Sequence, residues 1–295
     1  MEQFLFALGM VIVVAVFYDF LRTAIALNGL GLFSSLLART LWKLAKRIVP
    51  VGERRYKVAL RGAIGPSILI VLTAFWILVH LAGYTLMFSA GHALIDSQTK
   101  EPATIIQTIA FTGSALSTLG ASTVQVTNGW WDNLSMVAAV NGMIVLTLSV
   151  SFILNVLQTT TAARTFASRY NALMSKKGNL DRIGKLEGAA TLGGDLCDIA
   201  VKLSASPLPA FFSPHDQSMD FPSAIKQLCA MLDEEGLKTR MDSLSSVDIS
   251  ELSWGVGLLG RGERNDKGET DFEAAMLWAE HHVLDDHRSP LKTEE

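Results

Sequence analysis

Two adjacent stretches decide the fold of this chain: TIIQTIAFTGSALSTLGAS at residues 104–122 and LSMVAAVNGMIVLTLSVSFILNVL at residues 134–157. The second stretch is long enough to cross a membrane, because about 20 apolar residues in a helix span the hydrocarbon core of a bilayer. The first stretch predicts a helix over residues 104–117 that is too short to span, followed by Thr118-Leu119-Gly120-Ala121-Ser122. This order predicts a short re-entrant helix and a polar turn ahead of a spanning helix.

Two further apolar runs are long enough to span, one that begins at Phe4 and one at residues 66–89. A cleavable signal peptide is the alternative for the first run. Signal peptides begin with a positively charged region, whereas this chain begins Met1-Glu2-Gln3, so we favour a retained anchor. The sequence predicts an all-α membrane protein with three transmembrane helices, a re-entrant helix with its loop, and a helical tail.

Composition divides the chain into four segments. We expect an N-terminal transmembrane helix at residues 1–30, a basic amphipathic linker at 31–63, a membrane domain at 64–160 and a cytoplasmic helical domain at 161–295. In the linker, apolar positions such as Leu36 and Leu44 alternate with basic ones, which is typical of a helix that lies on a membrane surface.

Basic residues flank the spans unevenly, and this predicts the orientation. The linker and the segment after the third span are rich in lysine and arginine, whereas residues 91–103 hold only Asp96, Lys100 and Glu101 as charges. Because lysine and arginine accumulate on the cytoplasmic side, we expect the N-terminus outside and the C-terminus in the cytoplasm. In that reducing compartment, Cys197 and Cys229 are not expected to form a structural disulfide.

Ionisable residues inside membrane helices are candidates for function. Asp19 and Arg22 stand three residues apart, which places them on one helix face. We expect them to neutralise one another at the membrane edge, and a role in gating is the alternative. His80 lies within the second span. It is either a neutral imidazole hydrogen-bonded inside the bundle or a proton sensor, and the sequence leaves both readings open.

The turn at residues 118–122 has the chemistry that a potassium filter needs. Backbone carbonyls must replace the water shell of the ion, and a preceding short helix directs the negative end of its dipole at the cation. Thr118-Leu119-Gly120 resembles the inner half of the filter of the potassium-channel superfamily, particularly bacterial ion-channel-domain proteins with one pore loop. The resemblance covers about residues 64–160 and implies a potassium-channel-like pore domain there, with residues 104–117 as its pore helix. Ala121 stands where that family has an aromatic residue, and Ser122 stands where it has a second glycine.

This resemblance implies a cation channel in the bacterial inner membrane. The implied selectivity filter is Thr118, Leu119, Gly120, Ala121 and Ser122, acting chiefly through backbone carbonyls. One pore loop per chain implies a homotetramer, potassium is the implied permeant ion, and no cofactor is expected. Because Ser122 resists a positive φ angle by roughly 1 kcal/mol, the upper half of this filter is expected to be looser.

The third span carries further candidates for the pore. Gly142 stands where an inner helix bends in such channels, and we take it as a hinge candidate. Asn141 and Thr147 are candidates to line the pore, because each offers a polar side chain that suits a water-filled cavity.

Other patterns carry less weight. Residues 255–260 fit G-x-G-x-x-G, but the hydrophilic sequence that follows does not continue as the helix of a dinucleotide-binding unit. A metal site at His281, His282 and His287 is disfavoured, since neighbouring residues on a helix point in different directions. We find no enzyme motif, and the expected partners are the lipid bilayer and further copies of the chain, without nucleic acid or nucleotide cofactor. The alternative functions are a non-conducting channel-like anchor or sensor, and an enzyme within the tail.

Overall fold

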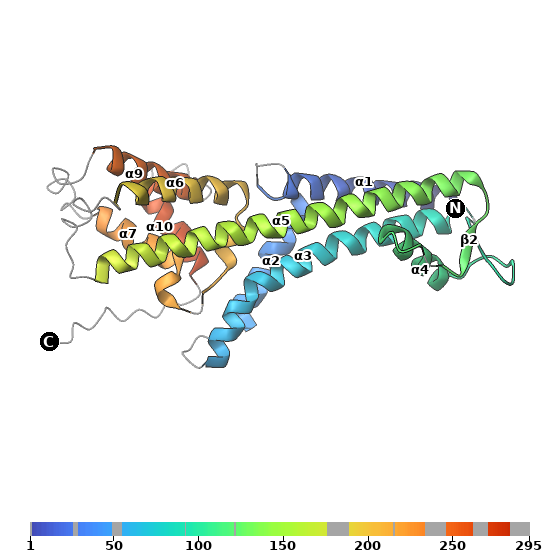
Figure 1. Cartoon of the computed structure of the whole chain (residues 1–295), viewed down its shortest axis with the longest axis horizontal. Helices are drawn as coiled ribbons and strands as arrows, with labels where there is room; N and C mark the ends of the chain where they lie inside the picture. Colours follow the sequence, from blue (N-terminus) through green and yellow to red (C-terminus); the bar gives the residue numbers. More distant parts are fainter. Residues whose placement is uncertain are drawn as a thin grey trace. The chain divides into compact units, whose positions relative to one another are not determined.

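The computed structural model describes residues 2–25, 29–48, 55–91, 93–120, 122–175, 189–214, 216–233, 246–261 and 271–283, and Figure 1 shows its course. Ala121, His287 and the basic residues between Lys176 and Lys185 lie outside the described residues. The helices are α1 (Glu2–Ala24), α2 (Leu32–Ile48), α3 (Arg55–Ser89), α4 (Ile105–Leu116), α5 (Gly129–Ser175), α6 (Ala189–Ala205), α7 (Phe221–Asp233), α9 (Ser246–Gly260) and α10 (Asp271–His282). Two 3-10 turns, η2 (Leu208–Phe211) and η3 (Gln217–Met219), and two strands, β1 (Leu94–Asp96) and β2 (Val124–Val126), complete the set.

Three of these helices are long and apolar enough to cross a membrane, over Glu2–Ala24, Gly62–Ser89 and Gly129–Ala172. They include the three runs that the sequence predicts. Figure 1 shows α5 as one long uninterrupted helix. Because the helix continues well past the apolar run that ends at Leu157, its last turns carry polar and charged side chains.

The chain divides into two compact units. The first comprises residues 1–26, 30–38 and 69–154, and the second comprises residues 27–29, 39–68 and 155–295. Most of α2 and the beginning of α3 therefore belong to the same unit as the C-terminal helices, which composition alone does not indicate. The four predicted segments stay predictions.

Within the first unit, α1 and α3 cross closely. A Cβ added to Gly9 would lie 2.5 Å from the carbonyl oxygen of Gly83, so the crossing requires small residues on both helices. Deeper in the unit, the Trp76 ring on α3 packs edge-on against Phe20 at 4.9 Å and against Phe152 at 5.6 Å. These fully buried rings hold α1, α3 and α5 together.

Asp19 is buried, with 3% of its surface exposed, and its partner differs from the predicted one. Its carboxylate accepts hydrogen bonds from the backbone N–H groups of Phe33 at 2.9 Å and Ser34 at 3.2 Å, in the first turn of α2. The described contacts include no ion pair with Arg22. Helix proximity alone suggested that pair, but a helix N-terminus offers unsatisfied donors and a positive dipole end to the same carboxylate. The expected neutralisation of Asp19 by Arg22 is therefore wrong.

A small sheet departs from the all-α prediction. Strands β1 and β2 pair antiparallel, with Leu94 opposite Val126 and Asp96 opposite Val124. Each strand has three residues, and such short segments carry too few alternating positions for sequence patterns to reveal them. The fold is otherwise mostly helical, as predicted.

The second unit has its own core, formed by the C-terminal part of α5 with α6, α7, α9 and α10. Gly255 and Gly260 of the G-x-G-x-x-G pattern lie in α9, not in a phosphate-binding loop. A Cβ on Gly255 would lie 2.8 Å from the Leu196 side chain, and one on Gly260 would lie 2.9 Å from Ala274. The glycines therefore permit close helix packing.

The turn η2 adds an aromatic contact within this unit. The Phe211 ring lies between Trp42 on α2, at 4.9 Å, and His282 on α10, at 5.7 Å. Lys46 lies over the Trp42 ring at 5.3 Å and donates a 2.5 Å hydrogen bond to the carbonyl of His281. His281 and His282 thus take part in packing contacts between α10 and α2.

Candidate pore loop

The short helix α4 begins at a well-formed cap. Thr104 and Gln107 form a capping box, in which the Thr104 hydroxyl accepts from the Gln107 backbone N–H and the Gln107 side chain accepts from the Thr104 backbone N–H. A capping box satisfies two of the donors that a helix start leaves unpaired. The observed bounds, Ile105–Leu116 with the cap at Thr104, agree closely with the predicted helix over residues 104–117.

Asp96, at the end of β1, ties this cap to the sheet. Its carboxylate accepts from the backbone N–H groups of Gln98 and Thr99 and from the side-chain amide of Gln107 at 2.7 Å. The hydrogen bonds from the Thr99 and Gln98 backbones, followed by that from Gln107, hold the pKa of Asp96 below its usual value. The ionised carboxylate therefore links β1 to the start of α4.

The other end of α4 closes in a Schellman motif. The N–H of Thr118 bonds to the carbonyl of Ala115, and the N–H of Leu119 bonds to that of Ser114, both at 3.0 Å. The motif needs a left-handed residue after the helix, and Thr118 takes that place with φ 57°. Glycine usually stands there, and a β-branched residue in this conformation costs about 1–2 kcal/mol.

The sequence predicted the strain of a positive φ at Ser122, but the structure places it elsewhere. Thr118 and Gly120 have positive φ, at 57° and 72°, and Leu119 between them does not. The Ser122 hydroxyl accepts the N–H of Val124 at 3.1 Å and so leads the chain into β2. The expectation that Ser122 must take a positive angle is therefore wrong.

Three backbone carbonyls at this turn are open. Thr118, Leu119 and Gly120 are exposed, and their carbonyl oxygens accept no hydrogen bond from any residue that the structure describes. The Thr118 hydroxyl is engaged, because it donates to the Ser117 carbonyl at 2.7 Å. The turn therefore holds three backbone oxygens without a described hydrogen-bond donor, and the role of these residues as a filter stays a prediction.

Gly142 lies against the end of α4. A Cβ added to Gly142 would overlap the carbonyl oxygen of Leu116, the last residue of the short helix. Only glycine lets the backbone of α5 approach this closely. Gly142 thus permits a close contact between α5 and α4. It lies inside the continuous helix α5, and its role as a hinge stays a prediction.

The two polar candidates on α5 have different surroundings. The Asn141 amide donates to the Tyr84 hydroxyl on α3 at 3.1 Å, beside an open groove of about 490 Å³ whose other lining residues, on α1 and α5, are apolar. Thr147 is exposed, and its carbonyl accepts the Ser151 hydroxyl at 3.3 Å. Whether either residue lines a pore stays a prediction.

His80 is 1% exposed, and its surroundings fit an imidazole that is hydrogen-bonded inside the helix bundle. Its Nδ1 lies 2.7 Å from the Trp76 carbonyl, which can only accept, so Nδ1 carries the proton of that hydrogen bond. The Phe17 ring meets the imidazole edge-on at 6.1 Å. Nε2 has no hydrogen-bond partner among the described residues.

Comparison with known proteins supports the membrane assignment without naming an activity. The chain is 29% identical over 161 residues to the uncharacterized membrane protein YdjJ of Bacillus subtilis. The matched region covers 54% of this chain and 46% of that protein. This chain therefore spans less than half the length of its relative. No family model and no solved structure matches it. Together with its three spans, the similarity identifies the chain as a membrane protein with transmembrane helices.

Proposed function

We propose that this protein is a subunit of a cation channel, with potassium as the permeant ion, and that residues 118–122 form its selectivity filter. The observation that carries the proposal is the set of open carbonyls at Thr118, Leu119 and Gly120. Backbone outside a helix is tolerated at membrane depth only where protein covers it or where it lines a water-filled cavity. An axial pore meets that requirement.

The direction of α4 supports the same function. Its C-terminal end runs straight into the turn, so the negative end of the helix dipole lies beside the open carbonyls. A cation at this position gains from both, whereas an anion is repelled by both. Arrangements of this kind exchange the water shell of an ion for carbonyl oxygens.

A single chain cannot surround an ion, so the proposal requires a tetramer around a central axis. Exposed apolar side chains on α4 and α5 are available to contact neighbouring chains or lipid: Ile105, Ile106, Ile109, Met136, Val137, Val140 and Met143. We place the channel in the bacterial inner membrane with the C-terminal unit in the cytoplasm, as the distribution of basic residues indicates.

Flux through purified full-length protein in liposomes tests the proposal, with Gly120→Ala and Gly129→Ala as matched variants. Gly120 has φ 72°, so a side chain there is strained, whereas Gly129 has open space and no positive φ. We expect potassium flux for the wild type and Gly129→Ala, and at least a tenfold loss for Gly120→Ala with the tetramer intact, because about 1–2 kcal/mol of strain acts on every chain of the tetramer. A wild-type protein that passes no monovalent cation, or that is a monomer or dimer in mild detergent, contradicts the proposal.

One observation favours the second candidate, a channel-like anchor or sensor that does not conduct. The Thr118 residue ends α4 as its left-handed cap, and its hydroxyl is bonded to the Ser117 carbonyl. The left-handed turn at Thr118 interrupts the extended backbone that a filter needs to point successive carbonyls at one axis. A stable tetramer without flux in the liposome experiment selects this second function.

A further inference from the structure

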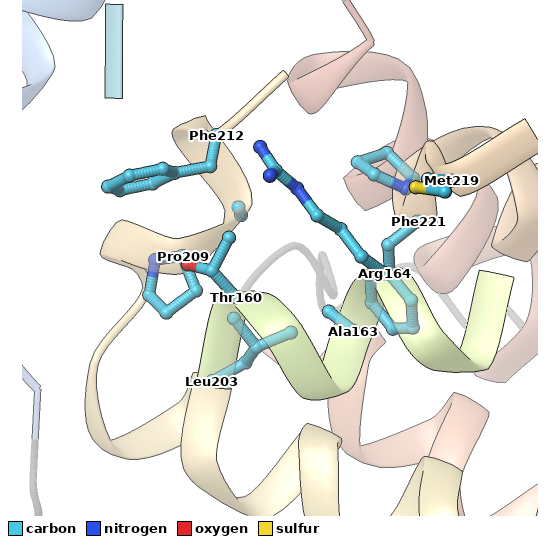
Figure 2. Close-up of a pocket in the computed structure, with 10 residues that line it drawn as sticks. Thr160, Ala163, Arg164, Leu203, Pro209, Phe212, Met219 and Phe221 are labelled. Atoms are coloured by element: carbon cyan, nitrogen blue, oxygen red, sulfur yellow. The ribbon is translucent and has the colours of Figure 1, made fainter. Parts of the chain in front are cut away.

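Arg164 occupies a small pocket in the second unit, shown in Figure 2. Its side chain leaves α5 beside Thr160 and extends toward the ring of Phe212, which follows η2. Apolar side chains form most of the remaining wall: Leu203, Pro209, Met219 and Phe221. The space left among them is about 10 Å³, which is roughly room for one water-sized group.

The guanidinium group in this pocket has no counterion in the described part of the chain. Its Nε is buried and makes no hydrogen bond there, and no described carboxylate forms an ion pair with it. Asp220, next in sequence to two wall residues, instead accepts the N–H of Ser223 at 3.1 Å at the start of α7. Arg164 is partly buried, and a buried N–H without a hydrogen bond is costly, so an acceptor from outside the chain that reaches Nε would stabilise this arrangement.

The position of Arg164 along α5 indicates which acceptor is within reach. Arg164 lies seven residues, about 10 Å, beyond the end of the apolar run at Leu157. The headgroup region extends about 5–8 Å beyond the hydrocarbon core on each side, so Arg164 lies at its outer edge, within reach of a lipid headgroup. Guanidinium N–H groups form charge-assisted hydrogen bonds to phosphate oxygens, and the space in the pocket suits one such oxygen.

We propose that Arg164 binds a phosphate group of a phospholipid headgroup. One oxygen of that phosphate enters the pocket. The proposal does not depend on ion conduction. It assigns α5, the spanning helix that continues into the C-terminal unit, a direct contact with anionic lipid at the membrane surface.

The test uses full-length protein in neutral detergent and measures thermal unfolding during titration with dioctanoyl phosphatidic acid. Arg164→Gln is compared with Arg169→Gln, on the same helix, because Arg169 already has an ion-pair partner in Asp195 at 2.7 Å. Both variants lose one positive charge. We expect wild type and Arg169→Gln to be stabilised alike, and Arg164→Gln to need at least about tenfold more lipid, as befits the loss of a charged hydrogen bond.

Further measurements distinguish a lipid phosphate from free phosphate and provide a second variant of Arg164. Dioctanoylglycerol, which lacks the phosphate, should give no Arg164-dependent shift. Inorganic phosphate that acts at similar concentrations, and only when Arg164 is present, retains the phosphate site but assigns it to free phosphate. Arg164→Lys retains the charge and covers the case in which Arg164→Gln fails to fold, and it should bind lipid more weakly than wild type. Equal lipid responses of the two glutamine variants, or of wild type and Arg164→Lys, overturn the proposal.

Discussion

The carboxylate of Asp19 accepts two hydrogen bonds from Ser34, one from its backbone N–H at 3.2 Å and one from its hydroxyl at 2.5 Å. The same hydroxyl accepts the indole N–H of Trp76 at 3.1 Å. A residue on α1 thus caps α2 while α3 completes the network. Such a network is costly to break, because removing one member leaves buried polar groups unsatisfied.

We therefore expect Asp19→Ala to lower the free energy of unfolding by about 1–3 kcal/mol. Asp132→Asn is the control, since Asp132 is an exposed carboxylate of the same unit. Thermal unfolding of the full-length protein in mild detergent measures both variants. Equal melting temperatures for Asp19→Ala and the control would show that the cap contributes nothing.

Gly142→Ala should destabilise the contact between α4 and α5. The added methyl group would overlap the Leu116 carbonyl, and overpacking of this kind costs about 1–3 kcal/mol. We expect a lower melting temperature and, if the protein conducts, reduced flux, because the end of α4 must move.

Gly113→Ala is the matched control for that variant. Gly113 lies in α4, and a Cβ there would meet only the Leu81 side chain at 3.8 Å, an ordinary contact. Alanine should be neutral or slightly stabilising at this position, since glycine inside a helix costs about 0.5–1 kcal/mol relative to alanine. A Gly142→Ala protein as stable as Gly113→Ala would refute the close contact.

Asp96 should make the loop between α3 and α4 sensitive to acid. Its pKa is lowered in the folded protein by the backbone N–H groups of Thr99 and Gln98, so its contribution is present above the unfolded pKa of about 3.9. That contribution is lost as the pH falls through the folded value. We expect constant protection of the Thr104 and Gln107 amides from hydrogen exchange at pH 5–7, after correction for intrinsic rates, and weaker protection below about pH 4. Asp96→Asn should remove this pH dependence, and an unchanged dependence in that variant would assign it to another group.

Labelling with a membrane-impermeant maleimide tests the proposed orientation. Starting from protein whose Cys197 and Cys229 are replaced by alanine, single cysteines are placed at Ser97 and Ser204, which are both exposed. We expect intact cells to label Ser97→Cys alone, and permeabilised cells to label both. The reverse pattern in intact cells would invert the topology.

Sequence patterns predicted the elements whose formation depends on near neighbours. The three spans follow from the length of apolar runs, and the short helix was expected from about Thr104, which the structure shows as the cap of α4. Even the end of α4 near Leu116 lies within one residue of the prediction. By contrast, the positive φ angle was expected at Ser122, whereas the structure has it at Thr118. The sequence does not show this, because the angle follows from the Schellman motif that ends α4.

What the sequence by itself determined is therefore the set of spans, the short helix α4 and the amphipathic α2, since hydropathy acts over a few turns of one helix. Only the tertiary structure decided that Asp19 caps α2 instead of pairing with Arg22, that Gly142 meets Leu116, and that Arg164 shares a small pocket with Phe212 and Phe221. Each of these depends on residues far apart in the chain. The local sequence around a residue indicates which kinds of partner it can bond to. The packing of other helices decides which of these partners comes within reach.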